Sequence, residues 1–340
     1  MDNQKQRDQK QMNHKEENQN MENQKKGSQK GNQTEELNAR KVMLAAEMYY
    51  LYDMSQKEIS DRLGVSRPWV SRLLKRARET GIVSIRISSP LAGSPEIEEA
   101  IRDRYGIRAV TVVPNVSEND HSNVSMAAAS YLVSHIQAGD RIGVSWGQSI
   151  AEMTTYVSGV HLPDVSIVPV VGGAGSEVSI LSNTNAANLA GALGASCSLL
   201  HAEACCADEQ EREIVLSNSR VREIIDQGEH ADIALLGIGG IDHSRIIGGG
   251  YVTAEEVEEM RARGIAGDVA FRFLQPDGRI ADVSFNRRVV ACDLHRIREN
   301  AREVIAIAYG REKAQIIRAA LRGGLITTLF TDEETARLLD

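Results

Sequence analysis

Aromatic residues are scarce in this chain, at only 4% of 340 residues. The hydrophobic fraction is nevertheless 42%, so the core has to be built mainly from Ile, Val, Leu and Ala, which suits a parallel sheet covered by helices. Long apolar runs are missing as well. None approaches the roughly 20 residues that cross a bilayer, and the polar N-terminus lacks the apolar segment of a signal peptide. These absences favour a cytoplasmic protein of the α/β class.

Cysteine is equally sparse, with four residues at positions 197, 205, 206 and 292 and no C-x-x-C pair. We therefore expect four reduced thiols and predict neither a metal site nor a cofactor. Common catalytic motifs are missing too, since the chain contains no G-x-S-x-G, no G-x-x-x-x-G-K-[ST] and no H-E-x-x-H. The sequence thus does not favour an enzyme.

Positive charge is concentrated at the front of the chain. Residues 1–90 hold 17 Lys and Arg against 12 Asp and Glu, whereas the remainder holds 22 against 35. Only one lysine, Lys313, follows residue 90. A basic front and an acidic remainder indicate a nucleic-acid-binding module joined to a body with another role.

Three segments are expected along the chain. Residues 1–34 are dominated by Gln, Asn, Lys and Glu, so we expect a disordered polar tail, with a weak non-specific DNA arm as the alternative. Residues 35–90 are predicted to form a DNA-binding domain, and a Ser/Pro/Gly-containing linker at 88–95 leads into the body. Residues 91–340 are predicted to bind an effector and to form the oligomer.

The DNA-binding domain is predicted from a helix-turn-helix pattern between Ser55 and Arg78, after a leading helix over 35–52. Ser55 and Glu58 have the spacing of a capping box, and Gly64 supplies the left-handed residue that ends the first helix. A second helix follows, in which Ser66 is the predicted cap, Pro68 lies in the first turn and Gly81 is the stop. A short strand, or wing, is expected over 82–87.

The second helix has a basic face opposite its apolar stripe, as expected of a helix that enters the DNA major groove. Arg can pair with guanine edges, while Lys and Arg neutralise phosphates. A solvated basic helix is the alternative. Two roles are predicted for Trp69, either packing against the first helix or contact with DNA sugars. The predicted DNA-binding residues are Ser66, Arg67, Trp69, Ser71, Arg72 and Lys75.

The body alternates short apolar runs with helical patterns, which predicts a doubly wound, mainly parallel sheet. A turn at 276–278 (P-D-G) favours a small hairpin between residues 268 and 290. Strands are expected at 109–113, 141–145, 165–171, 198–201, 233–237, 304–308 and 325–330. Helices are expected at 96–104, 124–136, 149–156, 185–193, 209–217, 254–263, 312–322 and 333–339.

Three glycine-rich loops follow predicted strands, at 143–149 (G-V-S-W-G-Q-S), 170–176 (V-V-G-G-A-G-S) and 235–242 (L-L-G-I-G-G-I-D). Ligands of parallel sheets collect at such strand ends, and a helix N-terminus can hold a phosphate. Each loop alone also fits a tight turn, but together they indicate one shared anion site.

Two charged residues add to this site. Lys313 begins the last long predicted helix and suits a phosphate group, with a solvated surface lysine as the alternative. Asp268 can accept hydrogen bonds from sugar hydroxyls. Asp242 and His243 are adjacent, which acid–base catalysis could use but which is more often a turn.

With these residues assembled, the chain resembles the SorC family of sugar-responsive bacterial transcriptional regulators, which includes the deoxyribonucleoside and central glycolytic regulators. The resemblance runs from Ala39 to the C-terminus. It is carried by S-Q-K-E-I-S-D-R-L-G-V-S-R-P-W-V-S-R-L-L-K-R-A-R-E-T-G-I-V, G-V-S-W-G, G-D-V and G-R-E-K-A-Q-I-I-R-A-A-L-R-G-G-L-I-T-T-L-F-T-D. It implies an effector domain folded like sugar-phosphate isomerases, a phosphorylated sugar as inducer, and tetramers on operator DNA.

The resemblance also implies which residues form the pocket. Gln148 departs from the small hydroxyl or glycine common at its position, and the D-G-H signature of the isomerases is absent. No lysine lies in the 170–176 loop, which disfavours a covalent imine there. By position, Ser145, Gly147, Gln148 and Ser149 look like the phosphate loop, and Gly172, Gly173, Gly237, Gly239, Asp268 and Lys313 look like the rest of the pocket.

The resulting hypothesis is a transcriptional regulator of a carbohydrate operon, a repressor or an activator, whose operator binding is controlled by a sugar phosphate. It is expected to act as a dimer or tetramer, without a cofactor. The alternative is a sugar-phosphate isomerase or hydrolase with an appended DNA-binding module.

Overall fold

The computed structural model describes residues 40–52, 54–80, 82–83, 94–114, 121–173, 181–242 and 244–339. It divides the chain into two compact units, residues 1–88 and 89–340. The predicted polar tail, most of the predicted wing, much of the linker and His243 lie outside the described residues. The finer boundaries at residues 34 and 90 stay predictions.

The first unit contains the predicted helix-turn-helix, formed by α2 (Gln56–Leu63) and α3 (Arg67–Glu79) after helical residues 40–50. Both hydrogen bonds of the capping box between Ser55 and Glu58 are present. Gly64 ends α2 at φ 63°, a conformation that glycine adopts without a Cβ clash. Ser66 is the N-cap of α3, but its predicted side-chain bond is not formed. The predicted helix stop at Gly81 lies outside the described residues, and Thr80 caps α3.

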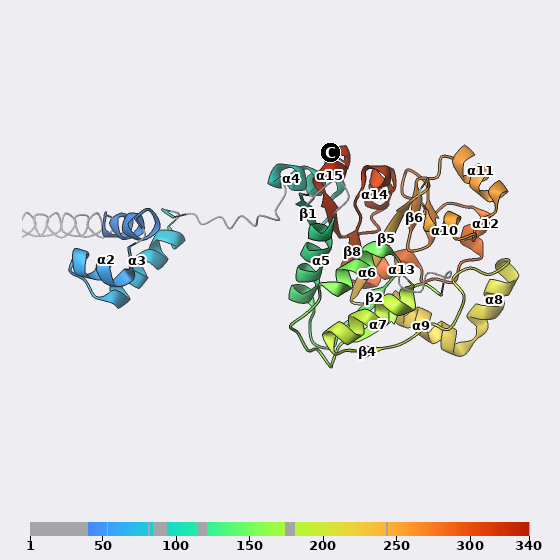
Figure 1. Ribbon diagram of the computed structural model, residues 1–340, viewed down its shortest axis with the longest axis horizontal. Coiled ribbons are helices and arrows are strands. Elements are labelled where there is room, and N and C mark those ends of the chain that lie inside the picture. The colour runs from blue at the N-terminus through green and yellow to red at the C-terminus, as the bar shows by residue number, and fades with distance from the viewer. Residues whose placement is uncertain are drawn as a thin grey trace, which may run out of the picture. The chain divides into compact units, whose positions relative to one another are not determined.

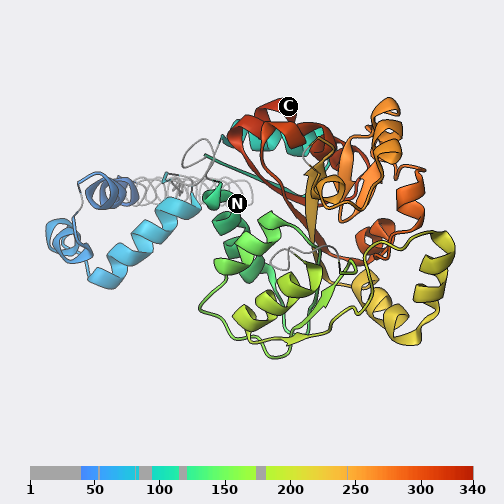
Figure 2. The same ribbon diagram turned by 45° about the vertical axis from the view of Figure 1, so that its right-hand side comes forward.

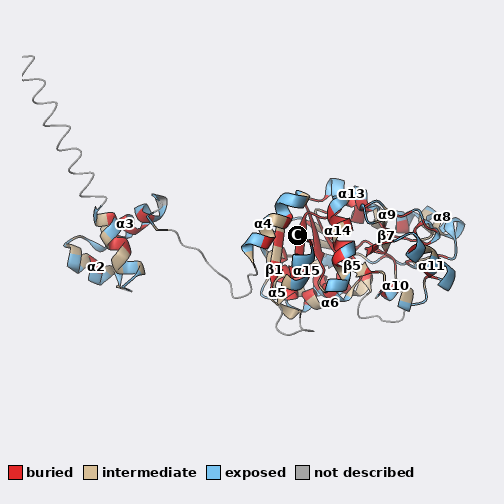
Figure 3. Cartoon of the chain, turned by 90° about the horizontal axis from the view of Figure 1, so that it is seen from above, coloured by how far each residue is buried: buried red, intermediate tan, exposed pale blue. Residues whose placement is uncertain are grey.

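The helices of this unit meet in their own hydrophobic core, while the polar side of α3 stays exposed (Figure 3). The predicted stripe of α3 is buried because its members recur at helical spacing on one face. This core is made of Val42, Ala45, Ala46, Ile59, Val70, Leu73, Leu74 and Ala77.

The second unit is organised by a mainly parallel sheet in the order β1-β9-β8-β5-β2-β3-β4 (Figure 1). From β2 the chain adds β3 and β4 on one side and β5, β8 and β9 on the other, while β1 lies at the edge beside β9. This reversal of direction confirms the doubly wound prediction. Its strands are β1 (Ala109–Val113), β2 (Arg141–Val144), β3 (Ser166–Pro169), β4 (Ser196–Cys197), β5 (Ile233–Gly240), β8 (Glu303–Ile307) and β9 (Thr328–Asp332).

Successive side chains of each strand enter different cores, as expected for a sheet covered on both faces. Ile233 and Leu235 of β5 belong to one hydrophobic cluster, whereas Ala234 and Leu236 belong to another. One face is covered by α5 (Ser122–His135), α6 (Gln148–Thr155) and α7 (Ser182–Leu193), and the other by α4 (Pro95–Tyr105), α13 (Leu294–Asn300), α14 (Ala314–Arg322) and α15 (Glu333–Leu339) (Figure 2).

An antiparallel arm extends this sheet beyond the carboxyl end of β5. β6 (Gly267–Val269) pairs with β5 and with β7 (Arg272–Leu274), so the predicted hairpin is confirmed. Its turn lies at Ala270 and Phe271, both with positive φ, and not at the P-D-G sequence, which forms the next turn. The arm is flanked by α8 (Glu209–Ser217), α10 (Arg245–Gly248), α11 (Ala254–Ala262) and α12 (Ser284–Arg287). α9 (Ser219–Glu229) packs on β2 and β3 of the main sheet and against α13.

Two expectations about elements of the body were wrong. The strand predicted at 198–201 is the shorter β4, because the backbone N–H of Leu200 donates to the Asn183 side chain at 3.0 Å and the chain leaves the sheet. Helices α9 and α13 were not predicted, although Val221, Ile224 and Ile225 of α9 have the spacing of a helix face.

The separate core of the first unit leads to a stability prediction. Leu73→Ala should destabilise this unit by about 2–5 kcal/mol, the cost of a buried leucine truncation, and leave the unfolding of residues 89–340 unchanged. Thermal unfolding followed by circular dichroism and limited proteolysis measures both. Arg76→Ala, at an exposed position of the same helix, is the control. A single transition that shifts as a whole would contradict the prediction.

Candidate functional site

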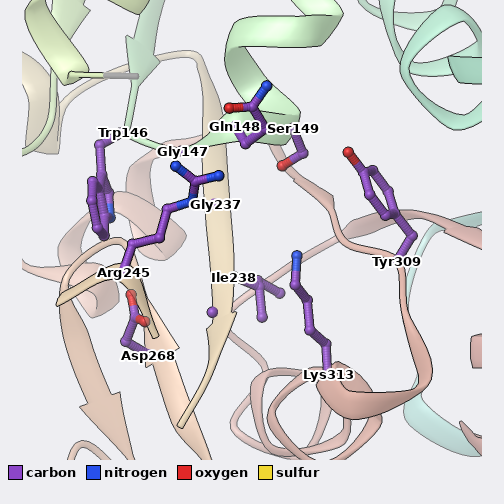
Figure 4. Close-up of a pocket in the computed structure, with 11 residues that line it drawn as sticks. Trp146, Gly147, Gln148, Ser149, Gly237, Ile238, Arg245, Asp268, Tyr309 and Lys313 are labelled. Atoms are coloured by element: carbon purple, nitrogen blue, oxygen red, sulfur yellow. The ribbon is translucent and has the colours of Figure 1, made fainter. Parts of the chain in front are cut away.

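A pocket of about 260 Å³ lies at the carboxyl ends of β2 and β5, where the strand order reverses. Ligands of open α/β sheets bind at this topological position. Figure 4 shows Lys313 pointing toward Ser149 and the start of α6, with Tyr309 on one side and Arg245 and Asp268 on the other. The lining residues are Trp146, Gly147, Gln148, Ser149, Gly237, Ile238, Gly239, Arg245, Asp268, Tyr309 and Lys313.

The loop between β2 and α6 is held from beneath by buried side chains. The Ser145 hydroxyl accepts a hydrogen bond from the Gly237 N–H at 2.7 Å and donates to the Trp146 carbonyl at 3.1 Å. The amide of Asn185 donates to the carbonyls of Ser145 and Gly147 at 3.2 and 3.3 Å. Gly147, at φ 130°, then starts α6. The first backbone N–H groups of α6 are thereby placed at the pocket, where the helix dipole favours an anion.

Glycines in β5 let other groups approach its backbone closely. A Cβ at Gly237 would lie 2.5 Å from the Trp146 carbonyl oxygen, and one at Gly239 would lie 2.4 Å from an Asp268 carboxylate oxygen. Both distances are too short for a Cβ atom. Only glycine at these two positions lets the β2 loop and the Asp268 carboxylate lie this close to β5.

Asp268 supplies a buried carboxyl group to the pocket. Its side chain accepts a hydrogen bond from the Phe271 N–H at 3.3 Å, which the positive φ of Ala270 and Phe271 makes possible by turning the chain back. Burial raises the pKa of Asp268 to about 7, against the lowering effects of the Phe271 N–H and the charge of Lys313. The group can therefore act as a hydrogen-bond acceptor or donor near neutral pH.

Lys313 lies at the end of the short helix η2 (Arg311–Lys313), with its ammonium 5.2 Å from the centre of the Tyr309 ring. Burial lowers its pKa, while Glu312 and Asp268 raise it. Tyr309 itself donates to Glu152 at 3.1 Å, and its ring stacks on His121. Burial destabilises the charged ammonium because it removes water from around it. A bound anion would stabilise the charged form again.

The structure brings together seven of the ten predicted effector residues, and the pocket lining does not include the other three. Ser145 lies behind the lining, as the support described above. Gly172 and Gly173 follow β3, and their N–H groups donate to the carbonyls of Val290 and Ala202 at 3.0 and 2.8 Å. These N–H groups are therefore not available to a ligand. The seven residues are Gly147, Gln148, Ser149, Gly237, Gly239, Asp268 and Lys313.

Four lining residues were not among the predicted ones. Trp146 lies within the G-V-S-W-G motif and packs edge-on against Phe271, with ring centres 4.8 Å apart. Ile238 lies between two predicted glycines and Tyr309 lies four residues before Lys313, so neighbouring motifs could have indicated them. Arg245 is in the four-residue α10, which has no periodic pattern to reveal it.

The predicted DNA-contacting residues lie on α3 and its N-cap. Ser66, Arg67, Ser71, Arg72 and Lys75 are exposed. Trp69 is half-buried against the core of the first unit, which favours the packing alternative. Their contact with DNA stays a prediction.

The described parts of the chain contain no group of three His, Cys, Asp or Glu side chains placed to hold a metal ion. No helix within them is both long and apolar enough for a bilayer crossing.

The pKa of Asp268 leads to a prediction about stability. Because the folded-state pKa of about 7 lies above the ordinary 3.8, the folded state loses stability as pH rises from about 4 to about 7. Asp268→Asn should remove this loss. The variant should match the wild type at pH 4 and exceed its unfolding free energy at pH 8 by up to about 4 kcal/mol. Urea unfolding at both pH values measures it, and equal stabilities at pH 8 would contradict it.

Models of known protein families match both units of the chain. The family model described as "Putative sugar-binding domain" matches residues 89–339, and a model for region 4 of sigma-70 matches residues 45–80. The first match covers the whole pocket, and the second covers α2 and α3.

Relatives match along both units together. The chain is 30% identical over 309 residues to the transcriptional regulator LsrR of Klebsiella pneumoniae subsp. pneumoniae, covering 89% of this chain and 92% of the relative. It is 29% identical to the deoxyribonucleoside regulator of Bacillus subtilis, over 87% of this chain and 95% of that one. The crystal structure of the full-length sorbitol operon regulator SorC from Klebsiella pneumoniae superposes with a TM-score of 0.68 at 30% identity, covering 88% of this chain and 98% of that chain. The chain therefore belongs to the SorC family of sugar-responsive bacterial transcriptional regulators.

Proposed function

We propose that this protein regulates transcription of a carbohydrate catabolic operon and that a phosphorylated sugar, bound in the pocket between β2 and β5, controls its binding to operator DNA. The observation that carries the proposal is the pairing of Lys313 with the N-terminus of α6 across one cavity. The named roles of the relatives, such as sorbitol operon regulator and deoxyribonucleoside regulator, support regulation of sugar genes.

The two ends of the pocket suit the two ends of a sugar phosphate. The backbone N–H groups at 147–149 and the ammonium of Lys313 favour the phosphate. On the other side, the Asp268 carboxyl suits hydroxyl groups, and the Trp146 ring beside it offers an apolar surface. A volume of about 260 Å³ suits one monosaccharide unit and not a longer saccharide.

Operator binding is assigned to the exposed face of α3, whose arginines and lysine suit base edges and phosphates. A homo-oligomer, dimer or tetramer, would place two such helices one DNA turn apart, roughly 34–36 Å. The effector controls DNA binding if it has different affinities for two arrangements of this oligomer.

The catalytic alternative finds little support in the site. It relied on Asp242 and His243, but Asp242 is exposed and is not among the lining residues, and His243 lies outside the described residues. Relatives that match most of the chain are named as transcriptional regulators. We therefore propose effector binding without turnover.

The phosphate end of the pocket can be tested with Lys313→Ala. Loss of a charge-assisted contact should weaken phosphorylated sugars roughly 10- to 100-fold and change the affinity for unphosphorylated sugars little. Thermal shift with matched pairs of sugars and sugar phosphates measures this, because a bound ligand stabilises by mass action. Arg311→Ala, an exposed cation of the same short helix, is the control. Equal weakening of both ligand types would contradict the proposed orientation.

The DNA-contacting role of α3 can be tested with Arg72→Ala in a mobility-shift assay on upstream DNA. Loss of a base or phosphate contact should weaken specific binding by about 1–3 kcal/mol. The control Arg40→Ala, exposed in the helical segment 40–50, should bind within a few-fold of the wild type. Wild-type affinity for Arg72→Ala would count against this assignment.

A further inference from the structure

A second cavity, of about 680 Å³, lies in the effector unit between α8, α9, β7 and the start of α13. α9 lies between α8 and α13 and packs against both (Figure 3). This cavity shares no lining residue with the pocket between β2 and β5. The second cavity contains none of the sequence motifs that predict the effector pocket. The proposed mechanism of regulation does not involve this cavity.

Two arginines converge in this cavity from different elements. Arg212 of α8 donates through Nε to the Val289 carbonyl at 2.8 Å, and Arg272 of β7 donates through Nη2 to the same oxygen at 3.4 Å. Arg272 also bonds to the carbonyls of Asn286 and Ala291. One shared acceptor therefore holds two guanidinium groups of like charge close together.

Backbone carbonyls give these guanidinium groups hydrogen bonds but do not neutralise their charge. Within the described residues, neither Arg212 nor Arg272 forms an ion pair with a carboxylate within 4.0 Å. Burial and the nearby charge of Arg212 lower the pKa of Arg272 to about 10, although Asp293 raises it. The two adjacent positive charges therefore repel each other, and burial of Arg272 adds to the cost.

The carboxylates at the inner end of the cavity are already engaged. Glu229 pairs with Arg296 at 3.0 Å and accepts from the Asp293 N–H at 3.0 Å. The Asp293 side chain accepts from the N–H groups of His295 and Arg296 and so caps α13. These acids stabilise the wall and leave the two arginines without a dedicated anion.

The rim is mixed in charge. Arg222 of α9 adds a third guanidinium, which is exposed, whereas Glu223 and Asp226 on the same helix are exposed acids. Asp226 lies 3.4 Å from His230. Acids at the rim repel a long polyanion such as nucleic acid, but a small anion can pass them and reach the arginines.

We propose that this cavity is a second anion site that binds a phosphate group, either free phosphate or the phosphomonoester of a small metabolite, between Arg212, Arg272 and Arg222. Guanidinium groups bind phosphate oxygens through paired hydrogen bonds. A dianion would neutralise two adjacent positive charges, which a single carboxylate would not. The bound group would also tie α8 and α9 to the β6–β7 arm, so the site would stabilise this edge of the effector unit.

Calorimetric titration of the full-length protein with inorganic phosphate tests the proposal. We expect two classes of site, one weakened by Lys313→Ala and the other weakened at least about tenfold by Arg212→Gln or Arg222→Gln. Arg220→Gln is the matched control, because Arg220 is an exposed arginine of α9 that does not line this cavity. Because Lys313→Ala affects only the effector pocket, it shows whether a missing class of phosphate site belongs to that pocket or to the second cavity.

A second titration, with glycerol 3-phosphate, identifies the source of the phosphate group. Tighter binding than phosphate at the Arg212-dependent site points to a metabolite ester, and weaker binding points to free phosphate. The proposal is overturned if phosphate binding is unchanged in both Arg212→Gln and Arg222→Gln, or if potassium chloride at equal ionic strength competes fully. Thermal unfolding in phosphate-free buffer shows that each variant is folded.

Discussion

The hydrogen bond from the Gly237 N–H to the Ser145 hydroxyl, 2.7 Å long and fully buried, is the contact on which the pocket depends. It joins the end of β2 to the end of β5 at the point where the sheet reverses its order. The bond forms only because position 237 has no Cβ, which would meet the Trp146 carbonyl. α6 then begins directly beside β5, and β5 is free to continue into the β6–β7 arm that carries Asp268. This contact helps to place the N-terminus of α6 and a buried carboxyl group on opposite sides of the same cavity.

Burial imposes an electrostatic cost on two ionisable groups of this cavity. Burial lowers the pKa of Lys313 and raises that of Asp268, so each group resists its charged form. In the proposed complex, a phosphate near Lys313 would offset the first effect, and a sugar hydroxyl near Asp268 would form a hydrogen bond with the second group. Lys313 and Asp268 already offset part of this cost for each other, and the proposed ligand would offset more of it by reaching both groups. This arrangement favours a molecule that carries phosphate and hydroxyls together over either component alone.

Much of the fold followed from local patterns in the sequence. The capping box at Ser55, the glycine stop at Gly64 and the helical spacing of the α3 stripe depend on neighbouring residues, so they could be predicted, and β1 was placed with its observed bounds. The pocket was harder. Gly172 and Gly173 lie in a glycine-rich loop like those that line the pocket. Their N–H groups, however, donate hydrogen bonds to the carbonyls of Val290 and Ala202, which are distant in the sequence. Arg245 reaches the pocket from a helix too short to show a period. Such features depend on tertiary contacts that composition does not encode.

Hydrogen exchange of the full-length protein, with and without a sugar phosphate that stabilises it, tests the central claim most directly. The account predicts slower exchange in two segments at once, residues 146–150 and residues 309–314, because one ligand contacts the start of α6 and the end of η2. Protection in only one of these segments, or protection confined to α8 and α9, would contradict it.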